Sequence, residues 1–145
     1  INMVNAPFIA KERGIEVQES TSNEVHEYTS TVQLQITSEK EERTVTGSIF
    51  GKGDSRIVQF DEYSLEAVIS KNMLVLNNMD VPGVIGNLGN ILGKHNLNIA
   101  GFHLGRVENG GKAVAIINID SPPTTEALKE LRNTANIIDV HSVTL

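Results

Sequence analysis

Residues 73–145 repeat the order strand, helix, strand twice, and this order constrains the fold more than any other feature of the chain. The helix expected over residues 84–95 rests on one apolar stripe, because Val84, Leu88 and Leu92 recur at helical spacing with Ile85 and Ile91 beside them. Short connections and right-handed crossovers place such a chain in one antiparallel sheet with both helices on one face, the ferredoxin-like βαββαβ plan. The expected elements are strands at 73–76, 98–106, 112–119 and 137–145 and helices at 84–95 and 125–133, the second with Thr124 as N-cap.

Three glycines interrupt the first of these helices. Gly86, Gly89 and Gly93 each cost about 1 kcal/mol relative to alanine in a helix interior. We therefore expect a sheet or a partner subunit to approach the helix backbone closely. The sheet face opposite the helices has no cover of its own, and we expect another copy of the chain or a neighbouring domain there.

The first half of the chain is more polar and rich in Thr, Ser and Glu. The change in composition near residues 70–72 predicts two domains, 1–71 and 72–145, and an α+β fold class. Within residues 3–13 a helix that starts late, because Pro7 suits only a first turn, should end at Gly14. Strands are expected at residues 28–36, 43–50, 56–60 and 65–69, as an antiparallel meander. Alternation in the first of them predicts a half-buried strand.

Composition excludes several classes of function. The net charge is −6 and there is no stripe of Lys and Arg, so binding to nucleic acid has no evident source. No cysteine is present, and the four histidines are not at metal-ligand spacing, so we predict no metal site. No apolar run reaches the roughly 20 residues of a membrane helix, and the absence of cysteine fits a cytoplasmic protein. The glycines over residues 83–89 lack the dinucleotide-binding spacing, and no catalytic set of side chains is found, so we predict no cofactor and no catalytic residue.

A polar junction follows the first strand of the second half. Asn78 and Asp80 end that strand, Pro82 and Gly83 turn the chain, and the free N–H groups of the helix N-terminus favour a carboxylate. Asp80 can pair with an ammonium, and Asn98 offers a donor and an acceptor. Together they complement a free amino acid. The alternative is that Asn78 and Asp80 cap the helix and Asn98 serves a turn, and spacing leaves both open.

These residues also carry a family resemblance. The stretch from Leu76 to Gly86, continued by Ile91-Leu92-Gly93 and by residues 96–100, resembles an ACT domain, and most closely the ACT domain of the D-3-phosphoglycerate dehydrogenases. Residues 4–7, 10–15 and 51–63 resemble the intervening, allosteric substrate-binding domain of the same family. The resemblance covers essentially the whole chain.

The resemblance implies a regulatory role rather than catalysis by this chain. In that family ACT domains pair across subunits and bind L-serine as feedback inhibitor, which assigns Asn78, Asp80 and residues 81–84 (Val81, Pro82, Gly83 and Val84) to one subunit and Asn98 to its partner. An anion is expected in the intervening domain near Lys52 and Arg56, with Asn5 nearby, and the alternative for these two basic residues is a solvated turn.

The resemblance also places catalysis elsewhere. It implies upstream catalytic domains that use NAD. Because the chain opens with Ile1, we interpret it as a piece whose first domain is incomplete and leans on a second copy. The alternative family is an ACT-bearing amino-acid enzyme such as an L-serine dehydratase.

Overall fold

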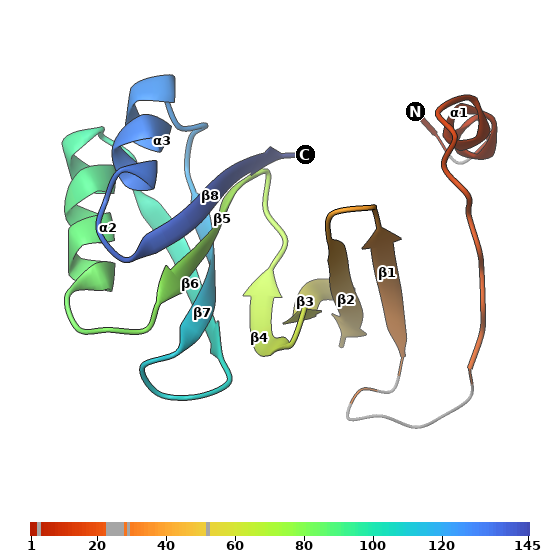
Figure 1. Cartoon of the computed structure of the whole chain (residues 1–145), viewed down its shortest axis with the longest axis horizontal. Helices are drawn as coiled ribbons and strands as arrows, with labels where there is room; N and C mark the ends of the chain where they lie inside the picture. The colour runs from red at the N-terminus through yellow and green to blue at the C-terminus, as the bar shows by residue number, and fades with distance from the viewer. Residues whose placement is uncertain (3, 23–27, 29, 52) are drawn as a thin grey trace.

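A computed structural model describes residues 1–2, 4–22, 28, 30–51 and 53–145 of the chain. The described residues form two four-stranded antiparallel sheets and three helices, which confirms the predicted α+β class (Figure 1). The first half contains α1 (Ala6–Glu12), β1 (Thr31–Thr37), β2 (Glu42–Phe50), β3 (Asp54–Phe60) and β4 (Tyr63–Val68). The second half contains β5 (Asn72–Met79), α2 (Val84–Lys94), β6 (Ile99–Arg106), β7 (Lys112–Ile119), α3 (Thr125–Arg132) and β8 (Ile137–Thr144).

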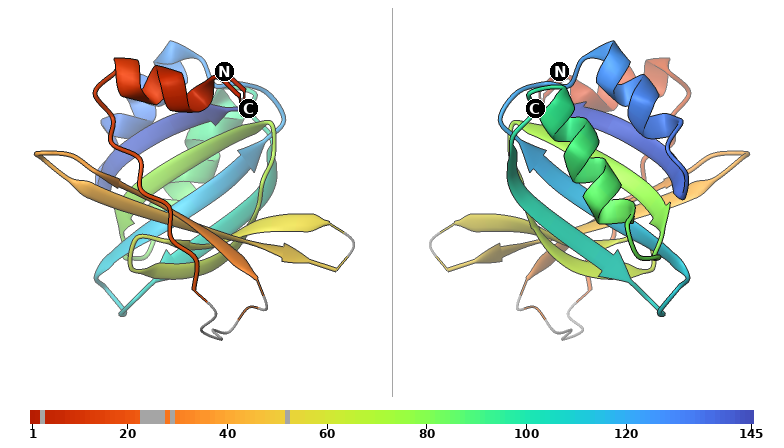
Figure 2. Two further views of the ribbon diagram at one scale, coloured as in Figure 1. Left: turned by 90° about the vertical axis from the view of Figure 1, so that its right-hand side faces the viewer. Right: turned by 90° about the vertical axis from the view of Figure 1, so that its left-hand side faces the viewer.

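The second sheet has the predicted βαββαβ plan. Its strand order is β6-β7-β5-β8, and α2 and α3 lie on the same face (Figure 2). The apolar stripe of α2 and the inward side chains of the strands form one buried core, whose largest members are Leu74, Leu76, Leu88, Leu92, Ile117 and Leu131. The hydroxyl of Thr124 accepts a hydrogen bond from the N–H of Ala127 at 3.2 Å, so Thr124 is the N-cap of α3 as expected.

The first sheet is the predicted meander, with order β1-β2-β3-β4. The helix α1 starts late, with Pro7 in its first turn, and Gly14 after it has a φ of +69° that favours glycine. None of the residues of α1 is buried.

The predicted burial of β1 is wrong. The side chains of Val32, Leu34 and Ile36 share one face as the alternation indicates, but they are 77%, 61% and 61% exposed, and all seven residues of the strand are exposed. Alternation determines which side chains share a face, whereas burial requires another element on that face. No other part of the described chain covers the apolar face of β1.

The two sheets meet through β4. Tyr63, Leu65 and Ala67 point from β4 toward Val114 and Ile116 on the face of the second sheet opposite the helices, and these five side chains are buried together. The expected neighbouring-domain cover of this face is therefore supplied by β4 (Figure 1). Division of the chain into domains at residue 71 stays a prediction.

Gly105 of β6 lies close against β4 of the first sheet. A Cβ atom at this position would lie 2.9 Å from the Cβ of Tyr63 and 3.1 Å from the carbonyl oxygen of Ser64, so only glycine fits without a shift.

Among the described residues, no helix is long and apolar enough to cross a membrane.

Candidate functional site

The N-terminus of α2 has no side-chain cap among the described residues. Gly83 occupies the N-cap position with a φ of +92°, a left-handed conformation that glycine adopts without strain. The capping interpretation of Asn78 and Asp80 is therefore wrong. No described side chain accepts from the first-turn N–H groups of the helix, of which that of Val84 donates to the carbonyl oxygen of Val81 at 3.5 Å. First-turn N–H groups without a side-chain cap favour an anionic ligand group.

Asp80 lies beside this helix end. Its carboxylate Oδ2 is 3.1 Å from Nη1 of Arg106, the last residue of β6, and its side chain is 20% exposed. Its backbone N–H donates to the carbonyl oxygen of Gly111 at 2.8 Å, which ties the residue to the β6–β7 hairpin. The carboxylate is thus held at a fixed place next to the uncapped helix.

Asn78 is buried, with 4% of its surface exposed. Its side-chain Nδ2 donates to the carbonyl oxygen of Met79 at 2.8 Å. Of the neighbouring predicted residues, Val84 is buried and Pro82 and Gly83 are exposed. Asp80 and the exposed backbone of residues 82–83 are therefore open to a ligand, whereas the side chain of Asn78 faces the interior.

Asn98 lies at the opposite end of the sheet. Strands β5 and β6 both run antiparallel to β7, so they point in the same direction, and Asn98 precedes β6 whereas Asp80 follows β5. The eight steps along the chain from Asn98 to Arg106 span about 26 Å at roughly 3.3 Å per residue. Asn98 donates from Nδ2 to Oδ2 of Asp120 at 2.7 Å. Within one chain, Asn98 and Asp80 do not form a common site.

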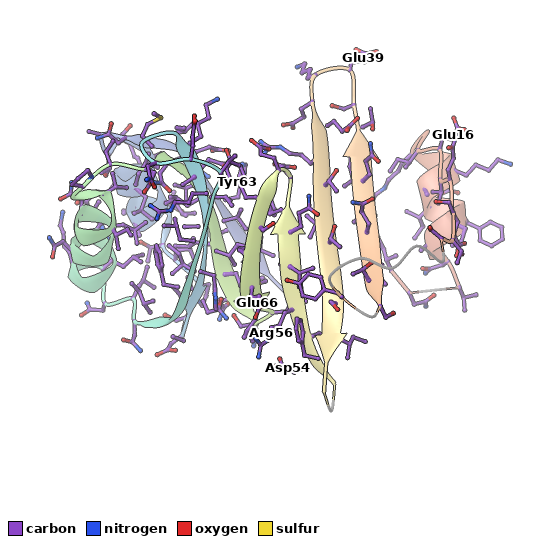
Figure 3. The ribbon with its side chains drawn as sticks, turned by 90° about the horizontal axis from the view of Figure 1, so that it is seen from below. Glu16, Glu39, Asp54, Arg56, Tyr63 and Glu66 are labelled. Carbon is purple, nitrogen blue, oxygen red and sulfur yellow. The ribbon has the colours of Figure 1, made fainter. Side chains whose placement is uncertain are left out.

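The predicted anion site has a different environment from the expected one. Arg56 is 2.6 Å from Asp54 and 2.9 Å from Glu66 through its guanidinium nitrogens, and it lies over the ring of Phe50 at 4.9 Å from its centre (Figure 3). The hydrogen bond to Asp54, and then the contact with Glu66, raise the pKa of Arg56. Two carboxylates therefore already neutralise this cation.

Of the other two members of the predicted anion site, only Asn5 lies within the described residues. Oδ1 of Asn5 accepts from the backbone N–H of Asn2 at 2.8 Å, and Lys52 lies outside the described residues. Arg56 lies in β3 and Asn5 is the N-cap residue of α1, and none of the described hydrogen bonds joins them.

The glycines of α2 are not explained by packing within the chain. A Cβ atom on Gly86, Gly89 or Gly93 would meet no atom within 4 Å beyond the local helix backbone. The expectation that a sheet of the same chain approaches them is wrong. An approach by a partner stays a prediction.

Sequence reasoning missed Arg106, which forms an ion pair with Asp80, and Asp120, which accepts a hydrogen bond from Asn98. The pairing of Arg106 with Asp80 could have been inferred from the predicted topology, because β5 and β6 are parallel and their last residues lie at the same end of the sheet.

In the described part of the chain, no three side chains of His, Asp or Glu are grouped closely enough to hold a metal ion.

Two protein-family models match successive parts of the chain. Residues 72–136 match the ACT domain family, and residues 1–61 match the D-3-phosphoglycerate dehydrogenase intervening domain family. The chain is 35% identical over its whole length to a D-3-phosphoglycerate dehydrogenase of Synechocystis, and 36% identical to that of Archaeoglobus fulgidus, where the alignment covers 26% and 28% of those proteins. It is also 26% identical, over 93% of its length, to 61% of a probable L-serine dehydratase beta chain of Bacillus subtilis.

The fold and the matched residues define the class: the chain carries an ACT domain behind a second antiparallel sheet. Over the whole length of the chain, the sequence is similar to the intervening and ACT region of the D-3-phosphoglycerate dehydrogenases. It spans about a quarter of the length of those relatives.

Proposed function

We propose that this chain is the regulatory region of a D-3-phosphoglycerate dehydrogenase of serine biosynthesis, and that it binds L-serine between two ACT domains. In this proposal NAD and 3-phosphoglycerate are bound by the parts of the dehydrogenase that the chain does not match, and this region carries no catalytic step. The observation that carries the proposal is the uncapped N-terminus of α2 beside the carboxylate of Asp80.

The chemistry of this corner complements a free amino acid. The first-turn N–H groups of α2 can receive a carboxylate, which the positive end of the helix dipole also favours. The carboxylate of Asp80 can accept hydrogen bonds from the α-ammonium group. A zwitterion therefore meets a group of opposite character at each end, and the side-chain hydroxyl of serine needs one further polar partner.

A second copy of the chain can supply that partner. Asn98 lies about 26 Å from Arg106 along β6, at the other end of the sheet. If two copies pack with their α2 helices antiparallel about a two-fold axis, each Asn98 approaches the Asp80 end of the other copy. The unfilled positions at Gly86 and Gly89 and the exposed side chain of Ile85 support a close approach along this helix.

A second candidate is the beta chain of an L-serine dehydratase. The chain covers 61% of that relative, against about a quarter of the dehydrogenases, and that relative is named for L-serine. The lower sequence identity, 26% against 35%, favours the dehydrogenase. In both candidates, L-serine is the amino acid that the protein recognises.

Titration calorimetry with L-serine tests the proposal, with D-serine as the stereochemical control. We expect heat with L-serine, loss of that heat in Asp80→Ala, and an unchanged dimer in the same variant. Asp139→Ala is the matched control, because Asp139 is an aspartate whose carboxylate contacts a side chain of its own strand, His141 of the edge strand β8. Equal affinity in wild type and Asp80→Ala would remove Asp80 from the site, and no heat with the wild-type protein would overturn serine binding.

A further inference from the structure

The last two residues of β6 face opposite sides of the second sheet. Successive side chains of a strand alternate between faces, and Gly105 and Arg106 use both. Gly105 lies under β4 of the first sheet, and Arg106 reaches Asp80 beside the N-terminus of α2. These two residues therefore connect the proposed serine site, at Asp80 and the N-terminus of α2, with the first sheet.

Arg106 holds the position that a ligand's ammonium would take. Its Nη1 lies 3.1 Å from Oδ2 of Asp80, and its side chain is 54% exposed. Ion pairs this exposed are weak and are readily exchanged for another cation. An amino acid that places its ammonium on Asp80 therefore competes with Arg106 for the same carboxylate.

Gly105 has no free space on the face of the sheet that packs against β4. The nearest atoms to a Cβ at this position belong to Tyr63, Ser64 and Val114, at 2.9, 3.1 and 3.3 Å. Strand β4 continues this contact into the first sheet, because Ser64 pairs with Gln59 and Val68 pairs with Arg56 of β3. In closely packed interiors a shift of one backbone is passed to the atoms that touch it.

We propose, resting on the serine site proposed above, that Arg106 is an internal competitor for the effector's ammonium and that its release from Asp80 is transmitted through Gly105 to Tyr63 of β4. In the unliganded chain the Arg106–Asp80 pair fixes the end of β6. When the ligand takes Asp80, that tether is released, and the contact of Gly105 with β4 changes. The effector site is thereby coupled to the sheet that carries Arg56.

The coupling can be tested without any ligand. The chain has no tryptophan and two tyrosines, so Tyr28→Phe leaves Tyr63 as the sole tyrosine and keeps a ring against Phe50. In this background Arg106→Gln removes the tether, and we expect a change in Tyr63 emission and faster amide exchange in β4. Lys112→Gln is the matched control, because it removes a positive charge opposite Met79 at the same end of the sheet. Identical Tyr63 emission and exchange in Arg106→Gln and its parent overturn the coupling.

The competition is tested by calorimetry with L-serine. Removal of a weak competing ion pair should tighten serine binding by between about 1.4-fold and 5-fold in Arg106→Gln. Lys112→Gln should bind as the parent does. Unchanged or weaker binding in Arg106→Gln overturns the competitor role. Absence of heat in the wild-type protein overturns the proposed function together with the competitor role, whereas the ligand-free measurement still decides the coupling.

Discussion

The backbone of Gly105 in the ACT sheet lies directly against the side chain of Tyr63 in the preceding sheet. This contact lets β4 cross the face of the ACT sheet that the helices leave open. Tyr63, Leu65 and Ala67 then share a buried cluster with Val114 and Ile116. The two sheets of this regulatory region are therefore joined by a common core and not only by the connecting residues 69–71.

Gly105→Ala should destabilise the protein. The new Cβ would lie 2.9 Å from the Cβ of Tyr63 and 3.1 Å from the backbone oxygen of Ser64, and neither neighbour is the flexible end of a side chain. Overpacking of this kind typically costs about 1–3 kcal/mol. Urea unfolding measures the loss, and a stability equal to wild type would show that the contact is looser than described.

Gly86→Ala should raise the stability of the protomer and weaken its self-association. Beyond the local helix backbone, no atom of the described residues lies within 4 Å of the added methyl group, so the protomer should gain about 1 kcal/mol from improved helix propensity. The proposed close packing of two α2 helices should weaken at the same time. Urea unfolding of dilute protein and sedimentation equilibrium report the two effects, and unaltered self-association would exclude this glycine from the interface.

Glu130 makes the packing of α2 against α3 dependent on pH. Its carboxylate is 2.8 Å from Nζ of Lys94 and 2.9 Å from Nε2 of His95, and the hydrogen bond from Lys94, followed by that from His95, lowers the pKa of Glu130. A lowered folded-state pKa gives stability that is present above the ordinary glutamate value of about 4.3 and is lost as the pH falls through the lower folded value.

Glu130→Gln should therefore show a smaller loss of unfolding free energy than wild type between pH 6 and 3. Urea unfolding at a series of pH values measures it. The same loss in both proteins would mean that other carboxylates are responsible for the acid sensitivity.

Thr124→Ala should destabilise α3 by about 1 kcal/mol, the usual effect of removing a threonine N-cap. The hydroxyl of Thr124 accepts from the N–H of Ala127, and alanine leaves that donor without its partner. Thermal unfolding gives the magnitude. Thr125→Ala, one residue further on, serves as control and should lower the stability much less.

The second half of the fold could be predicted from the sequence because one pattern determines both its elements and its core. The residues that give α2 its helical spacing, such as Leu88 and Leu92, are the same residues that fill the interior. The hairpin at residues 107–111 and the cap at Thr124 have local causes, and local causes are visible in a sequence.

Contacts between distant parts of the chain were harder to predict from the sequence. The alternation of Val32, Leu34 and Ile36 shows which residues share a face, but it does not show whether anything covers that face. The pairing of Asp80 with Arg106 depends on the parallel direction of β5 and β6, which the predicted topology implies but no local sequence pattern shows. The predicted residues around Asp80 do come together, and Asn98 does not join them within one chain.

The sharing of one serine site between two copies is tested most directly by mixing two inactive variants. Asp80→Ala and Asn98→Ala should each lose serine binding, because each removes one half of every site. After equilibration of an equal mixture, heterodimers should regain one intact site each, so that about one quarter of the wild-type serine sites return in calorimetry. A mixture that binds no more serine than the separate variants would contradict a site built from Asp80 of one copy and Asn98 of the other.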